Sequence, residues 1–101
     1  MAEFVAQGEV NVLGTTLYTG SSSSVLTKIT NLKFYNALAY TLRLERYNAT
    51  TATSEVIYDL TLSAGDAVSD TFLYALNSGD QLIVYTNIPG TTYYVYGVDY
   101  I

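Results

Sequence analysis

The alternation of apolar and polar residues along this chain predicts β-strands from one end to the other. Between residues 38 and 47, apolar side chains alternate with polar ones, which is typical of a strand with one buried face and one face in water. No stretch of a dozen residues keeps the period of an amphipathic helix. We therefore expect an all-β protein.

A chain of 101 residues is long enough for one domain, and the strand pattern places a short N-terminal extension before it. Seven or eight antiparallel strands, separated by turn residues, fit a two-sheet β-sandwich, and a small β-barrel is the alternative. We expect an N-terminal arm at 1–8, a single sandwich domain at 9–101 and a serine loop at 21–24. The expected strands span residues 9–13, 16–19, 25–35, 38–47, 55–62, 67–74, 81–86 and 91–101.

A five-residue pattern, Leu-x-x-Gly-Asp, occurs twice, ending at Gly65-Asp66 and at Gly79-Asp80. Glycine accepts the positive φ of a tight reversal, and aspartate bonds back to the local backbone. The repeat predicts two structural turns of a β-meander. Because asparagine can make the same local bond, we expect both aspartates to tolerate replacement by asparagine.

The last predicted strand is apolar and aromatic on both faces, with Asp99 as its only charge. An exposed strand of this kind invites aggregation, so we expect it to lie centrally in a sheet or beneath a partner. Tyrosine is also enriched at protein interfaces. The candidate interface residues are Tyr94, Tyr96 and Tyr100 of this strand and Phe4 of the arm.

Composition narrows the possible functions. Only 13% of the residues are charged, so tyrosine, threonine, serine and asparagine must make up much of the surface. The net charge of −5 disfavours a nucleic-acid partner. Without histidine or cysteine, the chain lacks the usual general base, the usual thiol nucleophile and the commonest transition-metal ligands.

The remaining chemistry would depend on carboxylates. Asp66 and Asp70 could form an acid–base pair, and with Asp80 they could contribute oxygens to a calcium site. Asp66 is already explained by its turn, and the spacing is not that of a dedicated calcium loop. We expect no catalytic, cofactor or metal site, and hence no enzyme; carbohydrate recognition by tyrosine faces stays open.

The chain shows neither an apolar run long enough to span a membrane nor a start typical of a signal peptide. We expect no membrane partner and synthesis in the cytoplasm.

The order of these sequence elements resembles that of the small β-sandwich virion proteins of tailed bacteriophages. The likeness covers roughly residues 12–101 and includes the Thr16–Thr19 segment, the alternation around Leu42 and both Gly-Asp turns. Such proteins decorate or cement the capsid, or serve as neck, tail or fibre components.

The resemblance implies a virion location and a non-enzymatic role. A capsid decoration or cement protein that binds and stabilises the assembled shell is the first expectation. A tail, neck or fibre component, with carbohydrate binding left open, is the second. The implied partners are the major capsid protein or other virion proteins, and we also expect a homo-oligomer, a trimer, with the last strand near the contact.

Overall fold

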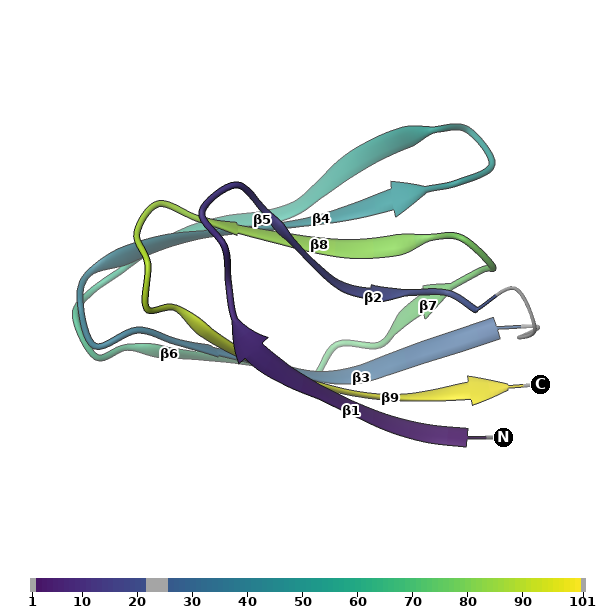
Figure 1. Ribbon diagram of the computed structural model, residues 1–101, viewed down its shortest axis with the longest axis horizontal. Helices are drawn as coiled ribbons and strands as arrows, with labels where there is room; N and C mark the ends of the chain where they lie inside the picture. The colour runs from purple at the N-terminus through teal and green to yellow at the C-terminus, as the bar shows by residue number, and fades with distance from the viewer. Residues whose placement is uncertain (1, 22–25, 101) are drawn as a thin grey trace.

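The computed structural model describes residues 2–21 and 26–100 and shows two antiparallel β-sheets packed face to face (Figure 1). One sheet, called here the β9 sheet, contains β1 (Ala2–Glu9), β9 (Thr92–Tyr100) and β3 (Leu26–Tyr35), with β6 (Ala67–Asp70) and β7 (Tyr74–Leu76) successively along the free side of β3. The other, the β8 sheet, has the order β2 (Thr15–Thr19), β8 (Gln81–Thr86), β4 (Tyr40–Asn48) and β5 (Thr53–Leu62). This arrangement confirms the predicted sandwich over the barrel.

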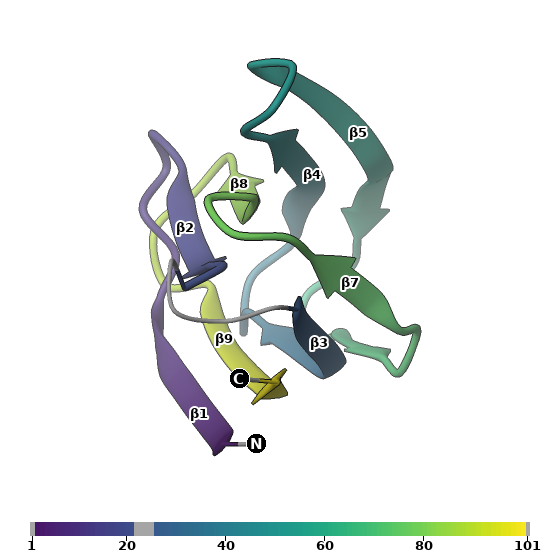
Figure 2. The same cartoon turned by 90° about the vertical axis from the view of Figure 1, so that its right-hand side faces the viewer.

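The chain passes repeatedly between the sheets. Apart from the β4–β5 hairpin and the successive segments β6 and β7, each strand is followed by a strand of the opposite sheet. With β6 and β7 taken as one interrupted strand, the two four-stranded sheets have the topology of a jelly roll. Figure 2 shows both layers from the end at which the two termini lie.

The core lies between the sheets and follows the predicted alternation. Leu32 and Phe34 of β3 are buried, whereas Lys33 and Tyr35 between and beyond them are exposed. A bulge at Thr30 shifts the register of β3 against β9, so that buried residues before and after it face the same core. The apolar and aromatic side chains that are almost fully buried are Val10, Ile29, Leu32, Phe34, Tyr40, Leu42, Leu44, Leu76, Leu82, Val84 and Val95.

The predicted meander is wrong, although both Gly-Asp turns exist. Gly65 and Gly79 have φ values of 78° and 84°, as the turn requires. Asp66 accepts a bond from the Ser63 amide at 3.3 Å, and Asp80 accepts one from the Asn77 amide at 3.1 Å. However, the first turn links β5 to β6 and the second links β7 to β8, so each crosses between sheets. A tight turn determines only a local reversal, whereas burial determines which sheet the next strand joins.

The N-terminal arm is also a wrong prediction. Residues 2–9 form β1, which pairs antiparallel with β9 of the same chain along its whole length. Phe4 and Ala6 both point toward the core; they are partly buried and pack against it. With so few large apolar residues in the segment, the alternation is weak in the sequence alone.

Other boundaries differ locally. Residues 10–13, expected as part of a strand, form with Gly14 the link from β1 to β2, where Val10 is buried and Gly14 has a φ of 109°. The expected strand at 67–74 is interrupted, because residues 71–73 leave the sheet between β6 and β7. Most of the predicted serine loop at 21–24, together with residues 25 and 101, lies outside the described residues.

Candidate interaction surface

Three of the four predicted interface residues share one surface. Tyr94, Tyr96 and Tyr100 alternate with Val95, Gly97 and Asp99 along β9; Val95 is buried in the core, so the tyrosines lie on the outer face of the sheet. β9 is central, between β1 and β3, which confirms the predicted placement of this strand. We call the outer face of the β9 sheet the tyrosine face; its β9 residues are Thr92, Tyr94, Tyr96, Val98 and Tyr100.

Neighbouring strands extend the tyrosine face on both sides. Val5 lies opposite Tyr96 on β1 and is 56% exposed, and Tyr35 of β3 is 45% exposed. Both lysines of the chain, Lys28 and Lys33, lie on β3 at this face, opposite Val98 and Tyr94. The sequence placed the tyrosines on one face but gave no sign that the lysines join them, because that depends on strand order.

Two contacts hold charged side chains against the tyrosines. The Lys28 ammonium lies 5.0 Å from the centre of the Tyr100 ring, within cation–π distance. On the opposite side, partial burial and a hydrogen bond with the Glu3 carboxylate raise the pKa of Tyr96. The tyrosine row is therefore flanked by a base on β3 and an acid on β1.

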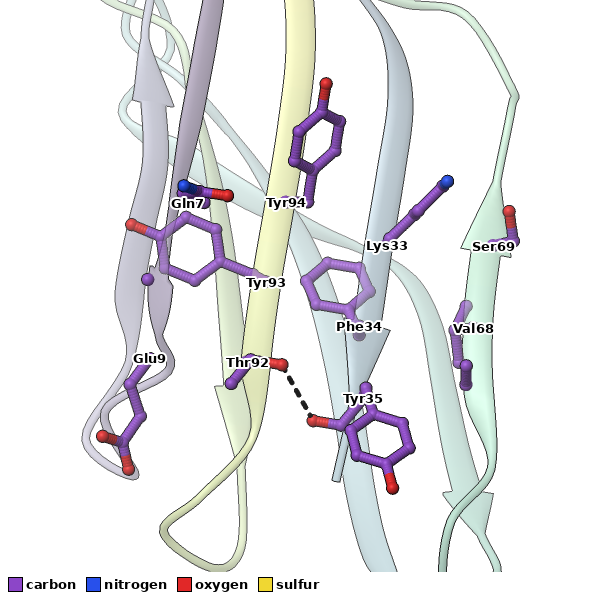
Figure 3. A pocket seen from close by; sticks show the side chains of 12 residues that line it. Gln7, Glu9, Lys33, Phe34, Tyr35, Val68, Ser69, Thr92, Tyr93 and Tyr94 are labelled. Carbon is purple, nitrogen blue, oxygen red and sulfur yellow. Dashed lines mark hydrogen bonds between the residues drawn. The ribbon is translucent and has the colours of Figure 1, made fainter. Parts of the chain in front are cut away.

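A groove lies across one end of the tyrosine face (Figure 3). Its volume is about 730 Å³, and the strands β1, β9, β3 and β6 all contribute to its lining. A second hollow, lined by Asn31, Lys33, Tyr94 and Tyr96, adjoins it and shares Lys33 and Tyr94 with it. The outward-facing residues of the main groove are Gln7, Glu9, Lys33, Tyr35, Ala67, Ser69, Thr92 and Tyr94.

Phe4, the fourth predicted interface residue, does not belong to this surface. Its ring stacks on Tyr18 of β2 with centroids 3.9 Å apart and an angle of 12° between the planes. Gly97 permits this contact, because a Cβ there would lie 2.5 Å from the Phe4 ring. Phe4 therefore joins the two sheets of its own molecule. It was predicted to contact a neighbouring molecule because residues 1–8 were expected to form an arm, whereas residues 2–9 form β1.

A carboxylate completes the link beside Phe4. Asp99 points inward from β9 and accepts hydrogen bonds of 2.5 Å from the hydroxyls of Tyr18 and Thr27. Burial, with the hydrogen bond and charge of Asp99, raises the pKa of Tyr18 to about 12. The single charge of the last strand thus connects β9 to both β3 and β2.

The other carboxylates considered for chemistry each have structural partners. Asp70 accepts bonds from the hydroxyls of Tyr58 and Tyr74, at 3.1 and 2.7 Å, and from the Phe72 amide. Burial and the charge of Asp70 raise the pKa of Tyr58, and burial and the bond to Asp70 raise that of Tyr74. Asp66, the proposed partner of Asp70, is engaged separately in its turn.

Asp80 has a larger role than a turn aspartate. It is only 1% exposed and forms a salt bridge of 3.1 Å with Arg46 of β4. It also accepts a bond from the Ala49 amide at 3.0 Å, in addition to the bond within its own turn. Within residues 2–21 and 26–100, no three carboxylates come together as a group that could hold a metal ion.

A smaller apolar area lies at the free edges of β5 and β6. Phe72 and Leu73, which follow β6, are each more than half exposed there. A groove of about 610 Å³ beside them runs between β5 and the β6–β7 segment. The sequence did not reveal this area, because 71–73 was expected to continue a strand.

Comparison with known proteins gives no family for this chain. No protein-family model matches it, and no curated protein is significantly similar to it. Among solved structures, it is similar to a protein of the Bacillus endospore appendages, a family of disulfide-linked pili. That match has 9% sequence identity and a TM-score of 0.44, over 99% of this chain and 87% of the other, which is too distant to inform function. The described residues include no helix that could span a membrane.

Proposed function

We propose that this protein is a non-enzymatic structural subunit of a bacteriophage particle, with capsid decoration or cementing as its first role. The observation that favours an assembly role is the tyrosine face. It covers the outer side of a sheet and has three tyrosines on its central strand, β9. No charged side chain of β9 points to this side, because Asp99 points inward.

The composition of this face is that of a protein interface. Tyrosine provides large contact area at little cost in conformational entropy, and interface centres are depleted in charged residues. The remaining carboxylates are consistent with a structural role, since Asp70, Asp80 and Asp99 stabilise turns and connect strands. These side chains serve the fold and leave the surface free for contacts.

The cementing role is tested by binding to shells. Purified protein should bind an assembled shell and not the isolated shell subunit, because the site would be composed across subunit boundaries. Particles lacking the protein should lose integrity at a lower temperature than complete particles. Equal heat resistance combined with reduced attachment to host cells would contradict cementing and favour a fibre component.

A second function, carbohydrate binding in a tail or fibre, is favoured by the groove on the tyrosine face. Tyr35 and Tyr94 could stack on sugar rings, and Gln7, Thr92 and Ser69 could bond hydroxyl groups. Reproducible binding on a glycan array, lost in Tyr94→Ala and retained in Tyr85→Ala on the other sheet, would favour this function. An array without binding would contradict it.

A further inference from the structure

The charged residues of the tyrosine face are sorted by strand. Glu3 and Glu9 lie on β1, and Lys28 and Lys33 lie on β3. Between them, the outward-facing residues of β9 are uncharged, because Asp99 points inward. The face therefore has an acidic side, an aromatic centre and a basic side.

Strand register aligns these residues in rows. Glu3 pairs with Val98 on one side, and Lys28 pairs with Val98 on the other, so the three side chains lie at one level across the sheet. The rows that follow are Val5, Tyr96 and Asn31, then Gln7, Tyr94 and Lys33. Acid and base lie on opposite sides of β9, two strand spacings or about 10 Å apart.

We propose that two copies of the chain pair through their tyrosine faces about a two-fold axis parallel to β9. Rotation by 180° about this axis leaves each residue at the same height along the strand direction. It places the acidic side of one copy over the basic side of the other. Glu3 of each copy then faces Lys28 of the other, and Gln7 faces Lys33. At the axis, Tyr94, Tyr96 and Val98 each meet their own equivalents.

The dimensions of the face suit a weak dimer of this kind. With the axis along β9, the strands that overlap are β1, β9 and β3; three strands about 4.8 Å apart and up to about 30 Å long give a flat area of about 430 Å² in each copy. Two such faces bury about 860 Å², within the range of weak interfaces, which lie below about 1,200 Å². Face-to-face sheets also pack readily, about 10 Å apart and within about 30° of parallel.

This symmetry favours a dimer over the trimer expected from the sequence. A two-fold contact uses the same surface on both subunits, whereas a three-fold contact joins two different surfaces. A face whose acidic and basic sides are exchanged by a two-fold rotation is complementary to itself. The proposal rests on the assembly role proposed above and names a second copy as the first partner; the loop ends and the edges of β5 and β6 stay free for a shell.

Charge exchange tests this pairing. We expect sedimentation equilibrium of the full chain to show a dimer. Glu3→Lys and Lys28→Glu should each weaken it at least about tenfold, because two attractive contacts become repulsive. The double variant with both changes should restore the dimer, since each new lysine again faces a glutamate of the other copy. Thr61→Lys, on the exposed face of the β8 sheet, is the control for added charge and should have no effect.

Several outcomes would overturn the proposal. These are a monomer or a trimer at every concentration, a dimer unaffected by the single changes, or a double variant no better than the single ones. Circular dichroism confirms that each variant is folded. A monomeric wild type that binds shells would refute the dimer while supporting the proposed function, and a dimer that binds no shell would refute only the cementing role.

Discussion

The glycines of the two Gly-Asp turns are required by the backbone, but their surroundings differ. Both have φ values near 80°, where a β-branched residue is strained. A Cβ at Gly65 would meet nothing within 4 Å, whereas one at Gly79 would lie 3.0 Å from the Ala49 Cβ. Identical sequence patterns therefore predict the same strain, while only the fold shows the added crowding at the second turn.

Valine at either glycine should lower stability. Gly65→Val should cost about 1–3 kcal/mol through backbone strain alone, and Gly79→Val should cost more because the side chain also meets Ala49. Urea unfolding measures both, and Gly65→Asn is a milder control, since asparagine tolerates positive φ. Equal stability of wild type and Gly65→Val would contradict this explanation.

The aspartates of the two turns should respond differently to asparagine. Asp66→Asn should be nearly neutral, because its bond to the Ser63 amide can be retained. Asp80→Asn should cost roughly 1–3 kcal/mol, since a buried carboxylate loses its charge opposite Arg46. Thermal unfolding of the two variants provides the comparison. Equal effects would show that the salt bridge contributes little.

Buried tyrosine hydroxyls should make stability depend on alkaline pH. The pKa of Tyr18 is raised from 10.0 to about 12 in the folded protein, so unfolding favours ionisation between these values. The contribution is complete below pH 10 and is lost as the pH rises toward 12. Urea unfolding from pH 8 to 12 should show the free energy of unfolding decline with pH, and the decline should be shallower in Tyr18→Phe. Identical slopes would contradict the assignment.

Among the strands, sequence patterns predicted those with regular alternation best. The predicted strand at 81–86 matches β8, and the faces of β9 are those expected from its tyrosines. β1 was missed because glycine, alanine and polar residues dilute its alternation. Strand order could not be predicted, because pairing between distant segments depends on burial of the whole molecule; the lysines of the tyrosine face were missed for this reason.

Deletion of residues 2–8 distinguishes a strand from an arm. Without β1, the Phe4–Tyr18 stack is lost and the edge of β9 is left unpaired. The melting temperature should fall by several degrees or more, as expected for the loss of a packed aromatic residue and an edge strand. A truncated protein as stable as the full chain would show that this segment contributes nothing to the fold.

In the whole molecule, the two sheets present different outer faces. The β8 sheet has Arg43, Glu45 and Asp59 on its central and edge strands, with Arg43 paired to Glu45 at 2.8 Å. The β9 sheet has its charges at the sides and tyrosines at the centre. This asymmetry, invisible in the overall composition, is the reason for proposing that one sheet faces solvent and the other faces a partner.

Crosslinking at single introduced cysteines tests the two-fold contact most directly, because the chain has no cysteine of its own. With the axis along β9, Val98→Cys places two thiols opposite each other, and a thiol crosslinker about 10 Å long should join them across sheets about 10 Å apart. Ala75→Cys is the control, because Ala75 is exposed on β7, two strand spacings from β9. In the dimer the two thiols at this position would be about 19 Å apart along the face, in addition to the distance of about 10 Å between the sheets. The two-fold pairing predicts covalent dimers for Val98→Cys and almost none for Ala75→Cys. Equal crosslinking at both positions, or none at Val98→Cys, would contradict it.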